Sequence, residues 1–292
     1  RELGKLKLAE ISIRNAIKLK YDFPVAHLNL GRILIEQFNL EEAEIFTRNA
    51  IKLSPNLLDA HNNLAFILKD LGKLEEAEES IRKAIKIKPD FTDAYFNLSF
   101  IELLKGDYKS GLKNYEFRLI KKEPVNLHGY SNNKFINDRK LNECQKLLVI
   151  SEQGLGDTIQ YMRYIPYLRD KGIDVSFSAQ EKLHTLIKVS GIDQNPLTMD
   201  KTKMFSEGYW IPLLSLPKYL GVEHGKPILN SPYIFSTDKL ISKWENILSI
   251  EKKPIIGINW QGNPKVENIL QGRSIPLEFF SILLASNDLK FL

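Results

Sequence analysis

The sequence predicts an α-helical solenoid followed by an α/β region built from parallel strands. Two observations predict this architecture. The first is a self-similarity at a period of 34 residues across residues 1–123. The second is an alternation of strands, glycine loops and helices that begins near residue 146. At 292 residues the chain is long enough for more than one domain.

The repeat is defined by its turn residues and by small residues at fixed distances from them. The turn residues are each 34 positions apart: Gly4, Phe38, Gly72 and Gly106. Twelve positions later, three units have alanine and the last has arginine: Ala16, Ala50, Ala84 and Arg118. The pattern resembles the tetratricopeptide repeat, a helix-turn-helix unit whose small residues allow close helix packing. It predicts one partial unit (1–23), two full units (24–57 and 58–91) and a degenerate unit (92–123).

One asparagine recurs on the first helix of three units, at Asn29, Asn63 and Asn97. Its amide offers a donor and an acceptor, which matches the hydrogen-bonding groups of a peptide backbone. The array resembles the asparagine ladder on the concave face of O-GlcNAc transferase repeats, along which extended peptides lie. This resemblance implies a peptide groove. The alternative is that the asparagines bridge or cap helices inside the solenoid.

Two histidines, His27 and His61, also occupy one repeat position, which Tyr95 fills in the next unit. Equivalent histidines suggest a metal site, but the tyrosine at the third position favours a packing role.

The second part of the chain changes period. Residues 124–145 are polar and predict a linker or docking segment. The predicted strands are 147–151, 173–178 and 255–260, and the predicted helices are 158–169, 181–189, 238–248 and one starting near residue 276. Because strands alternate with helices, we expect parallel strands with right-handed crossovers. Two strand-loop-helix starts about a hundred residues apart suggest two nucleotide-fold halves.

A glycine loop at residues 153–157 follows the first of these strands. Ligands of open α/β sheets bind beyond the carboxyl ends of the strands, where this loop is expected. Asp157 stands at the entrance of the next helix. It is either a helix cap, in a capping box with Gln160, or a catalytic base.

Four motifs in order carry a wider resemblance: SEQGLGDTIQYMRYIPYL (151–168), YWIPLLSLPKYLG (209–221), GINWQGNPK (257–265) and GRSIPL (272–277). They resemble bacterial proteins in which tetratricopeptide repeats precede a heptosyltransferase-like glycosyltransferase domain. The resemblance implies a GT-B architecture of two Rossmann-like halves facing a cleft. Residues 146–250 would form the first half, and 251–292 the start of the second, which would be incomplete.

The resemblance also implies roles for individual residues. Asp157 matches the proposed general base of heptosyltransferases, and Gly154 and Gly156 would keep its loop open. Arg273 matches a basic position suited to a diphosphate leaving group. The cleft and donor-binding residues would be Asn259, Trp260, Gly262, Asn263 and Arg273. The co-substrate would be a nucleotide sugar, with no metal and no other cofactor. Residues 265–271 depart from the family, which usually carries a histidine and an Asn-Asp-Arg element there.

These observations predict a glycosyltransferase whose repeats recruit a protein or glycan acceptor. The alternative is a non-catalytic repeat adaptor that binds other proteins. Because the chain starts at Arg1 and ends in what reads as the opening of a strand, we expect a fragment that is inactive alone. A net charge of +5 spread along the chain argues against a nucleic-acid partner. No apolar run is long enough for a membrane span, and the single cysteine, Cys144, favours a reducing, cytoplasmic compartment.

Overall fold

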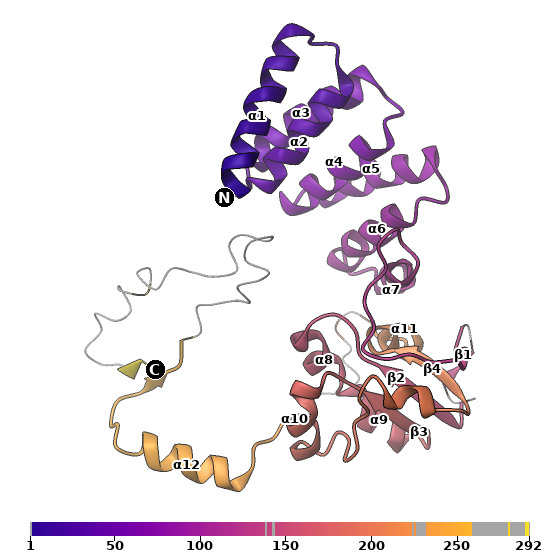
Figure 1. The fold of residues 1–292 in the computed structure, drawn as a ribbon, viewed down its shortest axis with the longest axis vertical. Coiled ribbons are helices and arrows are strands. Elements are labelled where there is room, and N and C mark those ends of the chain that lie inside the picture. The colour runs from indigo at the N-terminus through magenta and orange to yellow at the C-terminus, as the bar shows by residue number, and fades with distance from the viewer. Residues whose placement is uncertain are drawn as a thin grey trace. The chain divides into compact units, whose positions relative to one another are not determined.

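The computed structural model describes residues 2–137, 139–141, 144–223, 225, 232–258, 280 and 290–291. It separates into two compact units, Arg1–Ile234 and Phe235–Leu292 (Figure 1). The larger unit contains the helical repeats and a parallel sheet, and the smaller one contains an amphipathic helix and two short strands.

The repeats are seven helices joined by tight turns, in the order α1 (Glu2–Leu19), α2 (Pro24–Glu36), α3 (Leu40–Leu53), α4 (Leu58–Asp70), α5 (Leu74–Ile87), α6 (Thr92–Leu104) and α7 (Tyr108–Tyr115). A 3-10 turn, η1 (Glu116–Leu119), continues α7. Three of the predicted turn residues have positive φ, namely Phe38 (59°), Gly72 (76°) and Gly106 (84°). Gly4 does not form such a turn, because it lies inside α1. The helix-turn-helix prediction is therefore confirmed for the units after the first.

Small residues and ion pairs hold successive units together. Ala43 and Ala77, five positions after their turn residues, are fully buried, which lets the paired helices approach closely. Arg14 binds Glu42 at 2.7 Å, and Arg48, one period later, binds its equivalent carboxylate at 2.6 Å. The ion pair between successive units thus recurs with the same 34-residue period as the sequence.

Glu102, on α6, is a buried carboxylate between units. Its side chain is 3% exposed and accepts hydrogen bonds from Asn114 at 2.8 Å and Arg82 at 3.4 Å. Burial raises the pKa of Glu102 despite these two donors. Because the pKa of Glu102 is higher in the folded than in the unfolded protein, the protonated side chain stabilises the fold. This stabilisation is lost as the pH rises through the pKa of the folded state.

Replacing Glu102 by glutamine removes the charge and keeps one of the two oxygens that accept hydrogen bonds from Asn114 and Arg82. It should therefore raise the free energy of unfolding at pH 7 by at most about 1 kcal/mol, because one of the two donors loses its acceptor. The gain should shrink towards zero near pH ~4, where the wild-type carboxyl is neutral as well. Urea unfolding at both pH values measures the difference. Glu79→Gln, at an exposed residue, is the matched control. A Glu102→Gln variant less stable than the wild type at pH 7 would contradict this account.

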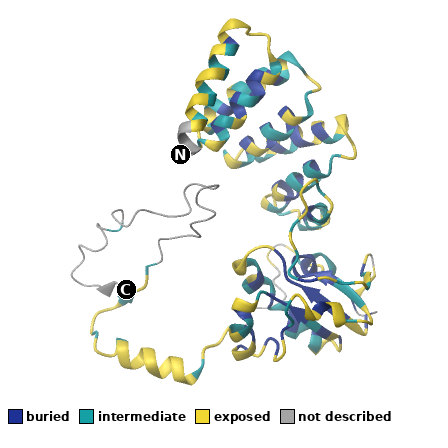
Figure 2. Cartoon of the chain, viewed as in Figure 1, coloured by how far each residue is buried: buried dark blue, intermediate teal, exposed yellow. Residues whose placement is uncertain are grey.

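The α/β part of the larger unit is a four-stranded sheet with strand order β1-β4-β2-β3. Its strands are β1 (Lys134–Phe135), β2 (Lys146–Ile150), β3 (Asp174–Ser178) and β4 (Tyr209–Pro212). All neighbouring pairs are parallel, as the sequence predicts. The apolar run Leu147–Ile150 is completely buried in the middle of the sheet (Figure 2), as expected of a strand covered on both faces.

Short helices follow the strands: α8 (Leu155–Tyr161) and α9 (Tyr164–Asp170) come after β2, α10 (His184–Val189) after β3, and α11 (Leu216–Leu220) after β4. The 3-10 turns η3 (Glu181–Leu183), η4 (Lys201–Met204) and η5 (Leu213–Ser215) lie between them. The predicted helix 158–169 is therefore two helices. The segment 124–145 supplies β1 to the sheet, and its residues Ile136 and Cys144 are buried in the same core as Phe177.

The smaller unit begins with α12 (Asp238–Leu248), which has the bounds that the sequence predicts. Thr237 caps this helix by accepting a hydrogen bond from the Leu240 amide at 3.2 Å. Strand β5 (Ile255–Ile256) pairs in parallel with β6 (Lys290–Phe291). Among the helices that the structure describes, none has the length and apolar character needed to cross a membrane.

Candidate functional site

The first candidate site is the surface of α2, α4 and α6 that carries Asn29, Asn63 and Asn97, here called the asparagine face. All three side chains are partly exposed. On the same helices, apolar side chains three, four or seven residues from an asparagine share its face and are exposed to solvent: Val25, Phe66, Phe100 and Leu104. The face therefore combines amide groups with uncovered apolar surface.

A pocket of about 240 Å³ lies on this face between α4 and α6. Phe66, Asn97 and Phe100 are among the residues that line it. The Asn97 amide donates to the Asn62 side-chain oxygen at 2.8 Å, so this asparagine does bridge two helices. The Asn63 amide nitrogen is different, because it is buried and has no acceptor among the described residues. The structure is therefore consistent with both roles of the asparagines. Asn97 bridges two helices, and Asn63 has an amide donor without an acceptor among the described residues.

The second candidate site is the glycine loop at the carboxyl end of β2. Gly154 is the N-cap residue of α8, and Asp157 follows it by three residues, in the first turn of that helix. A carboxylate oxygen of Asp157 accepts a hydrogen bond from the Gly154 amide at 2.9 Å. The predicted capping box of Asp157 with Gln160 is therefore corrected, since Asp157 reaches back to the cap residue instead of capping the residues after it. Gly156 has open space around its Cα.

Gln180, which follows β3, holds this loop in place. Its side-chain oxygen accepts a hydrogen bond from Thr158 at 2.8 Å, and its amide donates to the Gly154 carbonyl at 3.4 Å. Half-buried His128 lies nearby with its Nδ1 3.2 Å from the Ser151 hydroxyl. Burial lowers the pKa of His128, which favours the neutral ring. The carboxyl ends of β2 and β3 thus meet in a small polar cluster.

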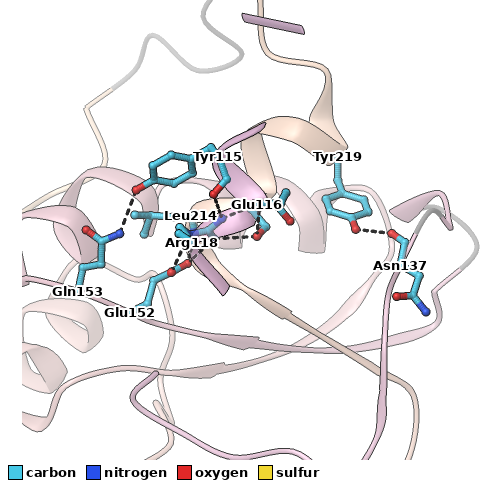
Figure 3. Close-up of polar contacts among 9 residues, drawn as sticks. Tyr115, Glu116, Arg118, Asn137, Glu152, Gln153, Leu214 and Tyr219 are labelled. Carbon is cyan, nitrogen blue, oxygen red and sulfur yellow. Dashed lines mark hydrogen bonds and ion pairs between the residues drawn. The ribbon is translucent and has the colours of Figure 1, made fainter. Parts of the chain in front are cut away.

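Arg118 joins the last repeat to this region (Figure 3). It is fully buried and pairs with Glu152 through two hydrogen bonds, of 2.9 and 2.7 Å. Its remaining donors bind Glu116 at 2.7 Å, the Tyr115 carbonyl at 3.2 Å and Ser215 at 2.8 Å. All five guanidinium N–H groups therefore have an acceptor. Burial acts to lower the pKa of Arg118, but the hydrogen bonds and charge of Glu152 outweigh it and raise this pKa further.

Sequence reasoning did not identify Arg118 as a structural residue. The available signal was that arginine replaces the alanine of the other units at this position. Tyr115 extends the same junction, since its hydroxyl accepts a hydrogen bond from Gln153 in the glycine loop at 2.9 Å (Figure 3). Gln153 has a φ of +60°, so the loop turns sharply at this contact.

The donor-binding residues expected from the resemblance lie outside the described residues: Asn259, Trp260, Gly262, Asn263 and Arg273. The histidines His27 and His61 are buried, and each ring is hydrogen-bonded through Nε2 to a backbone carbonyl at 2.8 Å. In the part of the chain that the structure describes, no group of three or more histidine, cysteine or acidic side chains forms a metal-binding cluster.

Comparison with known families supports the repeats. Tetratricopeptide-repeat profiles match residues 58–91 and 25–57, which are two of the units predicted from the period. No curated protein matches the chain.

Solved structures also resemble the chain. A MamA crystal structure is 18% identical and covers 42% of this chain and 71% of its own, with a TM-score of 0.39. MamA from Desulfovibrio magneticus RS-1 is 20% identical over 39% of this chain and 65% of its own (TM-score 0.37). The first TPR of Spaghetti (RPAP3), bound to an HSP90 peptide, is 20% identical over 36% and 82% (TM-score 0.35). The family profiles and the paired helices together show that the N-terminal region of this chain contains tetratricopeptide repeats.

Proposed function

We propose that the repeats bind an extended segment of a partner protein along the asparagine face. The observation that carries this proposal is the unused amide donor of Asn63 on α4, the helix whose Phe66 lines a pocket together with Asn97 and Phe100. A buried donor without an acceptor costs free energy, which a peptide carbonyl would recover on binding. Stacked helical repeats offer extended binding surfaces of this kind.

The test is selection of peptides from a displayed random library on the complete chain, followed by affinity measurements on variants. The triple variant Asn29→Ala, Asn63→Ala and Asn97→Ala should bind the selected peptides at least about tenfold more weakly, because each lost amide contact is worth about 1 kcal/mol. Asn49→Ala, on α3 and outside this face, is the matched control and should bind like the wild type. Equal affinities of the triple variant and the wild type would refute peptide binding by this face.

We also propose that the α/β part belongs to an inverting glycosyltransferase of GT-B architecture and that the repeats recruit its acceptor. The four ordered motifs described above support this, as does a parallel sheet with a glycine loop at the carboxyl end of β2. Asp157 would act as the base that removes the acceptor's proton. The Arg118 contacts support the recruiting role, since they tie the end of the repeats to Glu152 beside that loop. The test is transfer from a nucleotide sugar by variants of Asp157.

A further inference from the structure

The repeats carry one ring at the same position on the first helix of three successive units, namely His27, His61 and Tyr95. In the unit 24–57, Phe46 stacks on His27 with ring centroids 5.8 Å apart and an interplanar angle of 28°. In the unit 92–123, Phe117 stacks on Tyr95 at 4.5 Å and 12°, from a different repeat position than that of Phe46. No aromatic ring of the described residues packs on His61. The middle unit, 58–91, therefore has no stacked ring on its first helix, whereas the units before and after it have one each.

The sequence explains this difference. Ser80 stands one period after Phe46, and Pro55 stands one period after Tyr21, whose ring meets the edge of His27 at 5.1 Å. Both rings around His27 are thus replaced by smaller side chains around His61. A pocket of about 250 Å³ lies there, lined by Ser80 and His61 among others. A second, more open pocket includes Pro55 and again His61.

The cation that lies over Phe46 has an equivalent at the pocket over His61. Arg14 lies over Phe46, with its guanidinium carbon 5.4 Å from the ring centroid. Its equivalent one period later, Arg48, lines the pocket over His61. Arg48 is also held by two carboxylates, as Arg14 is. A ring in this pocket would contact Arg48 and His61, in the same way as Phe46 contacts Arg14 and stacks on His27.

The charged side chains around the two pockets indicate the charge of the ligand that carries such a ring. The lining acids are already paired, Glu76 with Arg48 at 2.6 Å and Glu79 with Lys83 at 2.7 Å. Lys52 and Lys86 also line the pockets, are exposed, and have no carboxylate partner among the described residues. Two free cations beside a pocket whose apolar lining is Ile51, Leu64 and Leu68 favour an acidic ligand with an apolar side chain.

We propose that the groove between α3 and α5, over His61, binds an aromatic side chain of an acidic segment of a partner protein. The aromatic side chain takes the place that Phe46 occupies in the unit 24–57, and the flanking carboxylates contact Lys52 and Lys86. This groove is lined by residues of α3 and α5 together with His61, Leu64 and Leu68 of α4. It shares no lining residue with the pocket on the asparagine face.

The test uses the complete chain and a labelled synthetic peptide with a central phenylalanine between glutamates, with binding followed by fluorescence anisotropy. Saturable binding is expected, together with a ring-current shift of the His61 ring protons in NMR spectra. Ser80→Phe should fill the pocket and weaken binding at least about tenfold. Ser80→Ala is the matched control, because it loses the same hydrogen bond from Ser80 to the His61 carbonyl but leaves the pocket open. It should bind like the wild type.

Two further measurements keep the proposal falsifiable if Ser80→Phe disturbs folding. A peptide with alanine in place of phenylalanine, and the surface variant Lys52→Glu with Lys86→Glu, should each weaken binding about tenfold. The triple asparagine variant should bind this peptide unchanged, which separates this groove from the asparagine face. The proposal fails if the wild type shows no saturable binding, if the alanine peptide binds equally well, or if Ser80→Phe binds as tightly as Ser80→Ala.

Discussion

Replacing Arg118 by methionine should lower the free energy of unfolding of the larger unit by about 3–5 kcal/mol. The variant leaves Glu152, which is completely buried, with the Leu214 amide at 3.1 Å as its remaining hydrogen-bond donor. An uncompensated buried carboxylate is far more costly than the loss of the ion pair itself. Because the pair joins η1 to the loop after β2, the loss should affect the repeats and the sheet together. Urea unfolding followed by circular dichroism measures it.

The matched control is Arg14→Met, which breaks a similar pair of Arg–Glu contacts at the protein surface. The Arg14 side chain is 32% exposed, so water replaces much of the lost interaction and the cost should stay below about 1 kcal/mol. Combining Arg118→Met with Glu152→Leu removes both charges and should recover a large part of the loss. If Arg118→Met is as stable as Arg14→Met, the buried pair does not hold the junction together.

The period of the sequence predicted the repeats well because each repeat position has a local physical reason. Gly72 and Gly106 sit where the chain needs positive φ, and Ala43 and Ala77 sit where two helices touch. Phe38 adopts the same conformation as these glycines, and its place in the period identified it. Gly4 follows the period without forming a turn, because the chain there continues as helix.

The contacts between distant segments could not be predicted in the same way. Arg118 departs from the alanine of its repeat position, but its partner Glu152 is 34 residues further along and belongs to a different kind of fold. Strand β4 lies in a short apolar run, but Pro212 within that run argues against a strand, and the pairing with β2 makes it one. The pocket over His61 exists because Ser80 is too small to fill the space that Phe46 fills over His27. This difference becomes visible only when the units are compared in three dimensions.

In the full-length protein, Asp157→Asn should lower the rate of sugar transfer about 100- to 10,000-fold, if Asp157 is the general base that we propose. Asparagine cannot take a proton, but its side-chain oxygen can still accept the hydrogen bond that the Gly154 amide donates at 2.9 Å. The loss should therefore appear in kcat while KM and thermal stability stay close to those of the wild type. Steady-state kinetics with a nucleotide-sugar donor measures it.

Comparison with Asp157→Ala separates the base from the helix cap. Alanine removes both functions, so this variant should lose the same activity and, in addition, about 1 kcal/mol of stability. Gln160→Ala, at an exposed position on the same helix, should leave both properties unchanged. If Asp157→Asn turns over like the wild type while Asp157→Ala is destabilised, Asp157 only caps α8. A catalytic role for the glycine loop would then have to come from another side chain at the ends of β2 and β3, where His128 and Ser151 already lie 3.2 Å apart.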